Sequence, residues 1–253
     1  MALATRVIPC LDIKDGKVVK GIKFQDLQEM GDPVDLATRY FLGGADEITY
    51  LDVSASLEGR NAILDLVSKT ADTIFIPLTV GGGIKTIADV SSYLKAGADK
   101  VSVGSAAMTS PNLLDEVSES FGDQVLVVSL DIKRDKSVKS GFTVTTHGGL
   151  RETGIDAFGW IEENQKRGIG ELLLNSMDFD GTRNGFDVYL ISQVRSITSL
   201  PIIASGGAGN AVHFAPAVEA GANAVLAASI FHSGQVSIQE VKNELRDSGM
   251  VVR

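Results

Sequence analysis

The sequence predicts an α/β fold: a single (β/α)8 barrel of the TIM type, built from two duplicated half-barrels. Short runs rich in Val, Ile and Leu alternate with longer stretches of helical periodicity, the pattern of a βα series. The motif Val7–Lys14 recurs as Leu126–Lys133, and Ile76–Gly83 recurs as Leu200–Gly207. A length of 253 residues suits eight βα units in one domain.

Each element follows from this pattern in order. Apolar runs predict strands near residues 5–12, 47–53, 74–80, 100–104, 125–131, 171–176, 201–205 and 223–228. The intervening stretches predict helices near 33–43, 60–72, 85–96, 111–120, 155–167, 184–197, 210–220 and 237–248. Two long connections, 13–32 and 132–154, follow the first and fifth strands. We expect one domain over residues 1–253, with half-barrels at approximately 1–122 and 123–253.

The duplication places further residues in matching positions. One constant spacing separates three pairs of identical residues: Pro77 and Pro201, Gly97 and Gly221, and Ser105 and Ser229. Because loops at the carboxyl ends of barrel strands carry the chemistry, residues at those ends are the candidates for function.

Composition and charge exclude several classes of protein. A net charge of −9 argues against general nucleic-acid binding. The single cysteine, Cys10, excludes an internal disulfide and fits a reducing cytoplasm. The first strand leaves no room for a signal peptide, and no apolar run approaches the ~20 residues that span a bilayer. We therefore expect a cytoplasmic protein without membrane contact. The three histidines have no spacing typical of a metal site, so neither a metal nor a cofactor is expected.

Asp12 and Asp131 end the first and fifth strands, which face one another in a barrel of eight. Two facing carboxyl groups suit general acid–base catalysis on a substrate between them. The alternative is that each aspartate caps a strand end by accepting hydrogen bonds from backbone N–H groups.

Two glycine-rich turns predict two phosphate sites. Glycine lets the backbone approach a phosphate closely, and a following helix supplies N–H groups. The alternative is that these glycines only form turns. Two sites imply a substrate with a phosphate at each end. The residues concerned are Gly82, Gly83 and Ser105 on one side, and Asp180, Gly181, Thr182, Gly206, Gly207 and Ser229 on the other.

Four charged residues are expected to meet at the opposite end of the barrel. Alternation along the strands puts Arg6 on the inward face with Asp12, at the bottom. Glu47, Lys100 and Glu171 begin the second, fourth and sixth strands at that level. A salt-bridged plug that seals the barrel is a sufficient explanation. Lys20 lies in the long first loop, where a solvated lysine is the alternative to a functional one.

Together these motifs resemble the cyclase-subunit family of imidazole glycerol phosphate synthase, from histidine biosynthesis. The resemblance covers essentially the whole chain. It is most specific at Cys10–Gly21, Gly31–Pro33, Thr79–Ile84, Thr146–Gly149, Thr153–Gly154, Met177–Thr182, Ile203–Gly209 and Ala227–His232.

The resemblance implies an ammonia-dependent lyase in which Asp12 and Asp131 are the catalytic acid and base and Lys20 belongs to a mobile loop. Ala228 then joins the second phosphate site. A glutaminase subunit, bound as a heterodimer at the N-terminal barrel face, would supply ammonia through a gate formed by Arg6, Glu47, Lys100 and Glu171. The substrate would be the bis-phosphorylated ribulosyl aminoimidazole carboxamide PRFAR, and the products imidazole glycerol phosphate and AICAR.

Two positions depart from the family pattern, and two other functions stay open. Gly104 stands where the cyclase commonly has Asn, and Phe179 replaces a usual arginine. One alternative is the sister isomerase, which performs an Amadori rearrangement on the same barrel; Cys10 and the Lys20–Gly21 pair favour the cyclase. The other is a non-catalytic scaffold for a glutaminase, against which the intact Asp12 and Asp131 argue.

Overall fold

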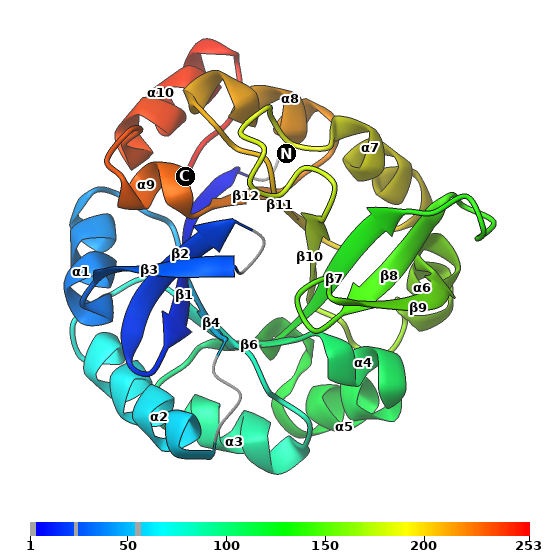
Figure 1. Ribbon diagram of the computed structural model, residues 1–253, viewed down its shortest axis with the longest axis horizontal. Coiled ribbons are helices and arrows are strands. Elements are labelled where there is room, and N and C mark those ends of the chain that lie inside the picture. Colours follow the sequence, from blue (N-terminus) through cyan, green and yellow to red (C-terminus); the bar gives the residue numbers. More distant parts are fainter. Residues whose placement is uncertain (1–3, 23–24, 54–56) are drawn as a thin grey trace.

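The computed structural model describes residues 4–22, 25–53 and 57–253, with the side chains of 20–22, 25–28 and 57–61 outside the description. Within these ranges, parallel strands close into a barrel surrounded by helices (Figure 1), which confirms the predicted fold class. Two strand pairs close the barrel: β12, the last barrel strand, pairs with β1, the first, and β10 pairs with β7. In order, the barrel strands are β1 (Arg6–Lys14), β4 (Ile48–Asp52), β5 (Leu78–Gly81), β6 (Lys100–Val103), β7 (Leu126–Arg134), β10 (Glu171–Ser176), β11 (Ile202–Ser205) and β12 (Ala224–Ala227).

Alternation along the strands produces two separate cores. In β1, Val7 and Leu11 pack outward against the helices, whereas Ile8 and Cys10 face the barrel interior. The interior cluster is smaller than the outer one and also contains Val127, Leu173, Ile203, Ala224 and Leu226. The interior is therefore a packed core with the chemistry confined to its two ends.

Several helices begin where a side chain accepts hydrogen bonds from the first backbone N–H groups. Asp32 caps α1, which has proline at its first position, and Thr86 and Ser237 form capping boxes at α3 and α10. The helices that cover the strands are α1 (Pro33–Leu42), α2 (Leu57–Ala71), α3 (Ile87–Lys95), α5 (Asn112–Phe121), α6 (Ala157–Asn164), α7 (Val188–Ile197), α8 (Phe214–Glu219) and α10 (Ile238–Asp247). Short 3-10 helices, η1 (Asp123–Val125) and η2 (Ala211–His213), precede β7 and α8. Among the described residues, no helix is both long enough and apolar enough to cross a bilayer.

The structure corrects the sequence prediction at two kinds of element. The long connections contain antiparallel strands, namely β2 (Lys17–Ile22) and β3 (Gln25–Gly31) after β1, and β8 (Phe142–Thr146) and β9 (Arg151–Asp156) after β7. Short helices, α4 (Ser105–Thr109) and α9 (Ser229–His232), follow β6 and β12. The third barrel strand also begins at Leu78 rather than near 74.

The order of elements is the same in the two halves. Each begins with a barrel strand and two antiparallel strands, and each ends with a short helix followed by a longer one. This agreement is consistent with duplicated half-barrels, whose common origin stays a prediction.

Candidate active site

A cavity of about 310 Å³ opens at the carboxyl ends of the barrel strands; we call it the mouth cavity. Asp12 and Asp131 both line it, on β1 and β7, which are four strands apart in either direction around the barrel. The other predicted residues that line it are Gly82, Asp180, Gly181, Gly206, Gly207, Ala228 and Ser229.

The two aspartates are held by strand pairing. Asp12 is 3% exposed and lies in register with Leu51 of β4 and Val19 of β2. Asp131 lies in register with Asn175 of β10 and Thr145 of β8. Burial raises the pKa of Asp131, the hydrogen bond from Asn175 lowers it, and the nearby charge of Asp180 raises it, with a net upward direction.

The predicted first phosphate turn joins β5 to the helix layer. Gly82 has a φ of +106°, and a Cβ there would meet the backbone oxygen of Asp52, so only glycine fits. Ser105 begins α4 after β6, and its Oγ accepts a hydrogen bond of 3.3 Å from the backbone N–H of His147. The β8–β9 hairpin therefore touches this site. Gly83 and Ser105 are not among the residues that line the mouth cavity.

The second turn lies at the end of β11. Gly207 has a φ of +102°, and a Cβ there would meet the carbonyl of Gly185, whose N–H donates to Gly207 O at 2.8 Å. The segment after β10 therefore packs directly on this turn. In that segment the Thr182 hydroxyl donates to Phe179 O at 2.7 Å, so it closes its own turn and does not line the cavity.

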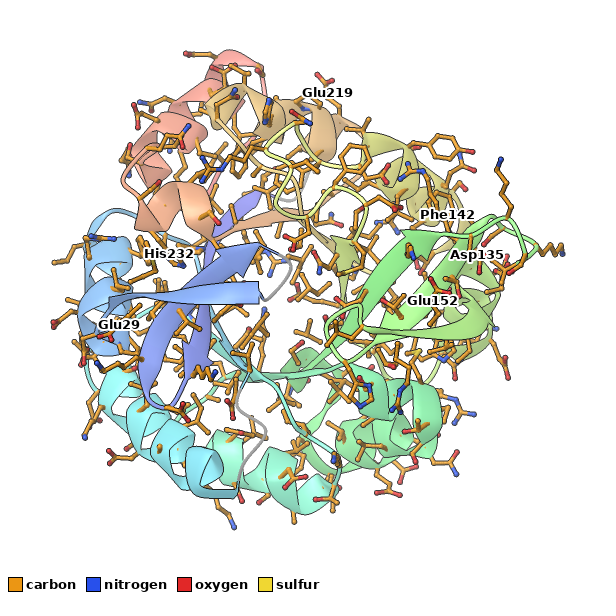
Figure 2. The ribbon with its side chains drawn as sticks, in the orientation of Figure 1. Glu29, Asp135, Phe142, Glu152, Glu219 and His232 are labelled. Atoms are coloured by element: carbon orange, nitrogen blue, oxygen red, sulfur yellow. The ribbon has the colours of Figure 1, made fainter. Side chains whose placement is uncertain are left out.

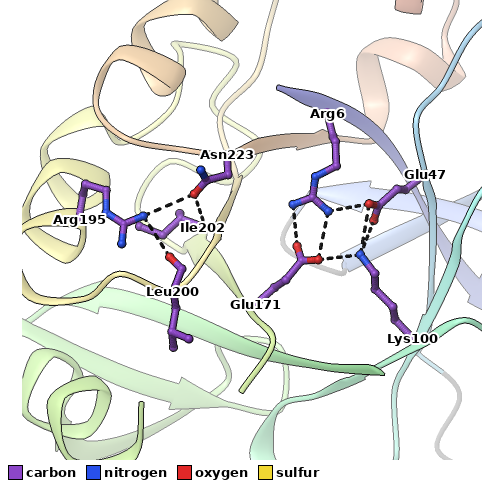
Figure 3. Close-up of polar contacts among 8 residues, drawn as sticks. All are labelled: Arg6, Glu47, Lys100, Glu171, Arg195, Leu200, Ile202 and Asn223. Carbon is purple, nitrogen blue, oxygen red and sulfur yellow. Dashed lines mark hydrogen bonds and ion pairs between the residues drawn. The ribbon is translucent and has the colours of Figure 1, made fainter. Parts of the chain in front are cut away.

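At the other end of the barrel, the four predicted charged residues form a closed set of contacts, which we call the floor ring (Figure 3). Arg6 bonds Glu47 at 2.6 Å and Glu171 at 2.7 Å, and Lys100 bonds Glu47 at 3.1 Å and Glu171 at 2.6 Å. Their side chains are at most 14% exposed.

In the floor ring, the pKa values of Arg6 and Glu171 are shifted in the directions that favour their charged forms. Burial alone lowers the pKa of Arg6, but Glu171 and Glu47 outweigh it and the net shift is upward. Burial raises the pKa of Glu171, but Arg6 and Lys100 outweigh it and the net shift is downward. Asp12 follows Arg6 by six positions along β1, which is about 20 Å at 3.3 Å per residue. The floor ring therefore cannot touch groups in the mouth cavity.

Sequence reasoning missed three residues beside the mouth cavity. Asn175 lines it and donates from Nδ2 to Asp131 Oδ1 at 3.0 Å. Arg183 also lines it, with a φ of +60°. Arg134 ends β7 outside it. A single asparagine or arginine does not belong to a recognisable sequence motif. Asn175 is nevertheless separated from Leu51 by the same spacing as the repeated Pro, Gly and Ser pairs, and this spacing could have identified it.

Arg134 ties three segments together. Its backbone N–H donates to Asp178 Oδ2 at 2.8 Å, and its Nη1 lies 2.7 Å from Asp187 Oδ2. Its guanidinium lies 5.3 Å from the Phe142 ring centroid and 5.4 Å from that of Phe179. Phe142 lies on the β8–β9 hairpin at the side of the barrel (Figure 2). Phe179, the departure from the family pattern, therefore contributes a ring face to Arg134.

Two residues that the sequence analysis singled out, Lys20 and Gly104, are not among the described residues that line the mouth cavity. The backbone of Lys20 lies in β2, but its side chain is outside the described residues. Gly104 precedes α4, and a Cβ there would have ordinary contacts of 3.6 Å with Ser129 O and 3.9 Å with Ser129 Cβ. Within the described part of the chain, no three His, Cys, Asp or Glu side chains gather as a metal ion would require.

Comparison with known proteins identifies the family. A family model described as histidine biosynthesis protein matches residues 6–237. A protein of Corynebacterium urealyticum named imidazole glycerol phosphate synthase subunit HisF is 58% identical over 245 residues, 97% of each chain. Proteins of the same name from Thermobifida fusca and Salinispora arenicola are 56% and 57% identical over the full length of both chains. The chain therefore belongs to the histidine biosynthesis protein family and, within it, to the HisF subunits of imidazole glycerol phosphate synthase.

Proposed function

We propose that this protein is the cyclase subunit of imidazole glycerol phosphate synthase, an ammonia-dependent lyase of the cytoplasm. It uses ammonia from a glutaminase subunit to convert PRFAR into imidazole glycerol phosphate and AICAR. The observation that carries the proposal is one cavity with a carboxyl group on each of two opposite walls and a glycine turn on each side between them. The relatives named for this synthase favour it over the sister isomerase and over a non-catalytic scaffold.

Asp12 and Asp131 would move the protons. Ammonia that attacks a substrate carbon must lose a proton, and the group that departs must gain one. With carboxyl groups on opposite walls, one can accept the proton from ammonia while the other donates a proton to the departing group. The upward pKa direction of Asp131 brings its titration closer to neutral pH, which suits a group that both accepts and returns a proton.

The two glycine turns would hold the two phosphates. Gly82, Gly83 and Ser105 supply one set of backbone donors, and Gly206, Gly207 and Ser229 the other. Gly181, Thr182 and Ala228 flank the second set. Among the described residues that line the mouth cavity, the charged side chains are Asp12, Asp131, Asp180 and Arg183. Arg183 is therefore the cation available there to offset a phosphate charge, while Lys20 of β2 would add a second from the first connection.

The floor ring would be the ammonia gate, and the N-terminal barrel face around it the glutaminase site. Its two positive and two negative side chains can pair to close the passage and separate to open it. The same contacts would also stabilise the barrel floor, and the two roles are compatible.

An assay of the isolated chain with PRFAR and an ammonium salt tests the proposed function. We expect loss of substrate absorbance that depends on both reactants. Turnover of the isomerase substrate, without turnover of PRFAR, would overturn the assignment. No turnover of either by a folded protein would favour the scaffold.

A further inference from the structure

The two aspartates occupy matching positions, but the strand neighbours beside them differ. Asp12 lies in register with Leu51, and Asp131 lies in register with Asn175. Leu51 and Asn175 are separated by the same spacing as the repeated Pro, Gly and Ser pairs, and both line the mouth cavity. One carboxyl group therefore has an aliphatic neighbour and the other an amide.

The amide of Asn175 contacts Asp131 and lies next to the second glycine turn. Its Nδ2 donates to Asp131 Oδ1 at 3.0 Å. Its Oδ1 lies on the side of Gly206, where a Cβ on that glycine would be 3.1 Å away. An ionised carboxylate only accepts hydrogen bonds, so the NH₂ group of the amide must face Asp131. The side chain of Asn175 therefore lies between the carboxyl group of Asp131 and the second glycine turn.

We propose that Asn175 is a positioning residue for Asp131, whose amide holds this carboxyl group in the orientation that proton transfer requires. This inference rests on the proposed function, in which both aspartates move protons. Leu51 has no donor to offer Asp12, so the amide serves one of the two carboxyl groups.

The charges around Asp131 support this assignment. The Asn175 hydrogen bond favours the carboxylate and lowers the pKa of Asp131, against the effects of burial and of Asp180. Asp12 and Arg183 line the same cavity. On the neighbouring strands, Lys100 of β6 and Glu171 of β10 lie in the floor ring, and β8 has no charged residue, although His147 follows it. Asn175 is therefore the group in hydrogen-bond contact that holds the pKa of Asp131 down.

The test exchanges the two neighbours. Asn175→Leu gives Asp131 the same residue type beside it that Asp12 has in β4, and Leu51→Asn is the matched control because it changes the neighbour of the other aspartate. The protein is labelled with carboxyl-¹³C aspartate, and the Asp131 signal is assigned by its absence in Asp131→Asn. Its titration is followed by NMR, and steady-state rates are measured with PRFAR and ammonium, expressed per free ammonia.

We expect Asn175→Leu to move the Asp131 titration upward and to lower kcat about tenfold, the effect of losing one hydrogen bond to a charged group, with little change in KM. Leu51→Asn should leave the Asp131 titration where it is. Asn175→Asp has the same shape but replaces the donor by a carboxyl group, so its upward shift should be larger.

An Asp131 titration unchanged in Asn175→Asp overturns the inference, even if Asn175→Leu does not fold. So does a fall in thermal stability of Asn175→Leu without a change in titration, because the role is then only structural. Full activity in Asp131→Asn would instead contradict the proposed acid–base function. The two failures are therefore distinguishable.

Discussion

The carboxyl groups of Asp12 and Asp131 line the mouth cavity from β1 and β7, away from the glycine turns that would hold the substrate. We therefore expect Asp12→Asn and Asp131→Asn each to lower turnover by at least ~10²-fold, the loss typical of a positioned proton donor or acceptor. Substrate affinity, measured by calorimetry, should stay within a few-fold because the phosphate contacts remain. Near-normal rates in both variants would show that neither residue moves protons.

Gly104 and its counterpart in the second half-barrel have similar backbone angles but different residue types. Ala228 stands at the duplicated spacing from it and precedes α9 with similar backbone angles, φ −122° and ψ −75° against −107° and −102°. Because a Cβ at 104 would make only ordinary contacts, Gly104→Ala should fold and raise the free energy of unfolding by about 0.5 kcal/mol, through a less flexible unfolded chain. Urea unfolding measures this, and a loss above ~1 kcal/mol would show that position 104 needs glycine.

Among the elements, the sequence predicted the barrel strands and the longer helices, and it missed strands without apolar alternation and very short helices. β8 is buried along its whole length, so its two faces do not differ in burial. β9 is largely exposed and α4 and α9 have five and four residues, so neither apolar alternation nor helical periodicity could reveal them. The floor ring was predictable because its four members begin or directly precede barrel strands, which places them at the same end of the barrel. The position of Asp12 then shows that Arg6, six residues earlier on β1, also faces inward. The contacts of Arg134 could not be predicted, because they join a strand end, a loop and a hairpin that no local sequence pattern connects.

Arg134 connects these elements, so its removal should disturb the segment at 177–187 that packs on Gly207. Asp187 is 3% exposed and also caps α7 through Leu190 N at 3.1 Å. Arg134→Met leaves this carboxylate without its cation, and we expect a loss of about 2 kcal/mol in the free energy of unfolding, together with a KM for PRFAR raised several-fold.

The neighbouring residue provides the control for Arg134. Lys133 pairs with Glu152 at 2.6 Å, but both side chains are exposed, at 44% and 62%. Lys133→Met should therefore lower the free energy of unfolding much less than Arg134→Met does, and it should leave KM unchanged. Equal effects on KM in the two variants would mean that Arg134 does not hold the second phosphate turn.

At the scale of the whole molecule, about 20 Å of strand separates the sites of the two proposed activities. We propose proton transfer at the mouth cavity and ammonia entry at the floor ring. Lys100→Met keeps the side-chain length but leaves Glu47 and Glu171 sharing one cation. The barrel should lose about 3 kcal/mol of stability, as expected when a buried pair loses one partner. If the floor ring is a gate, glutamine-dependent activity with a glutaminase subunit should also fall more than activity with external ammonium, which reaches the open mouth from solvent.

Stability and gating are separated by a second buried pair at the same end of the barrel. Lys242 bonds Asp46 at 2.8 Å, with both residues at most 6% exposed, and Asp46 accepts the backbone N–H of Val7. Lys242→Met should destabilise the protein to a similar degree, yet leave the ratio of glutamine-dependent to ammonium-dependent activity unchanged, because this pair lies outside the floor ring. The ratio in Lys100→Met, compared with that in Lys242→Met and in the parent, therefore measures gating free of the stability effect. If the ratio is the same in all three proteins, the floor ring supports the barrel and does not control the passage of ammonia.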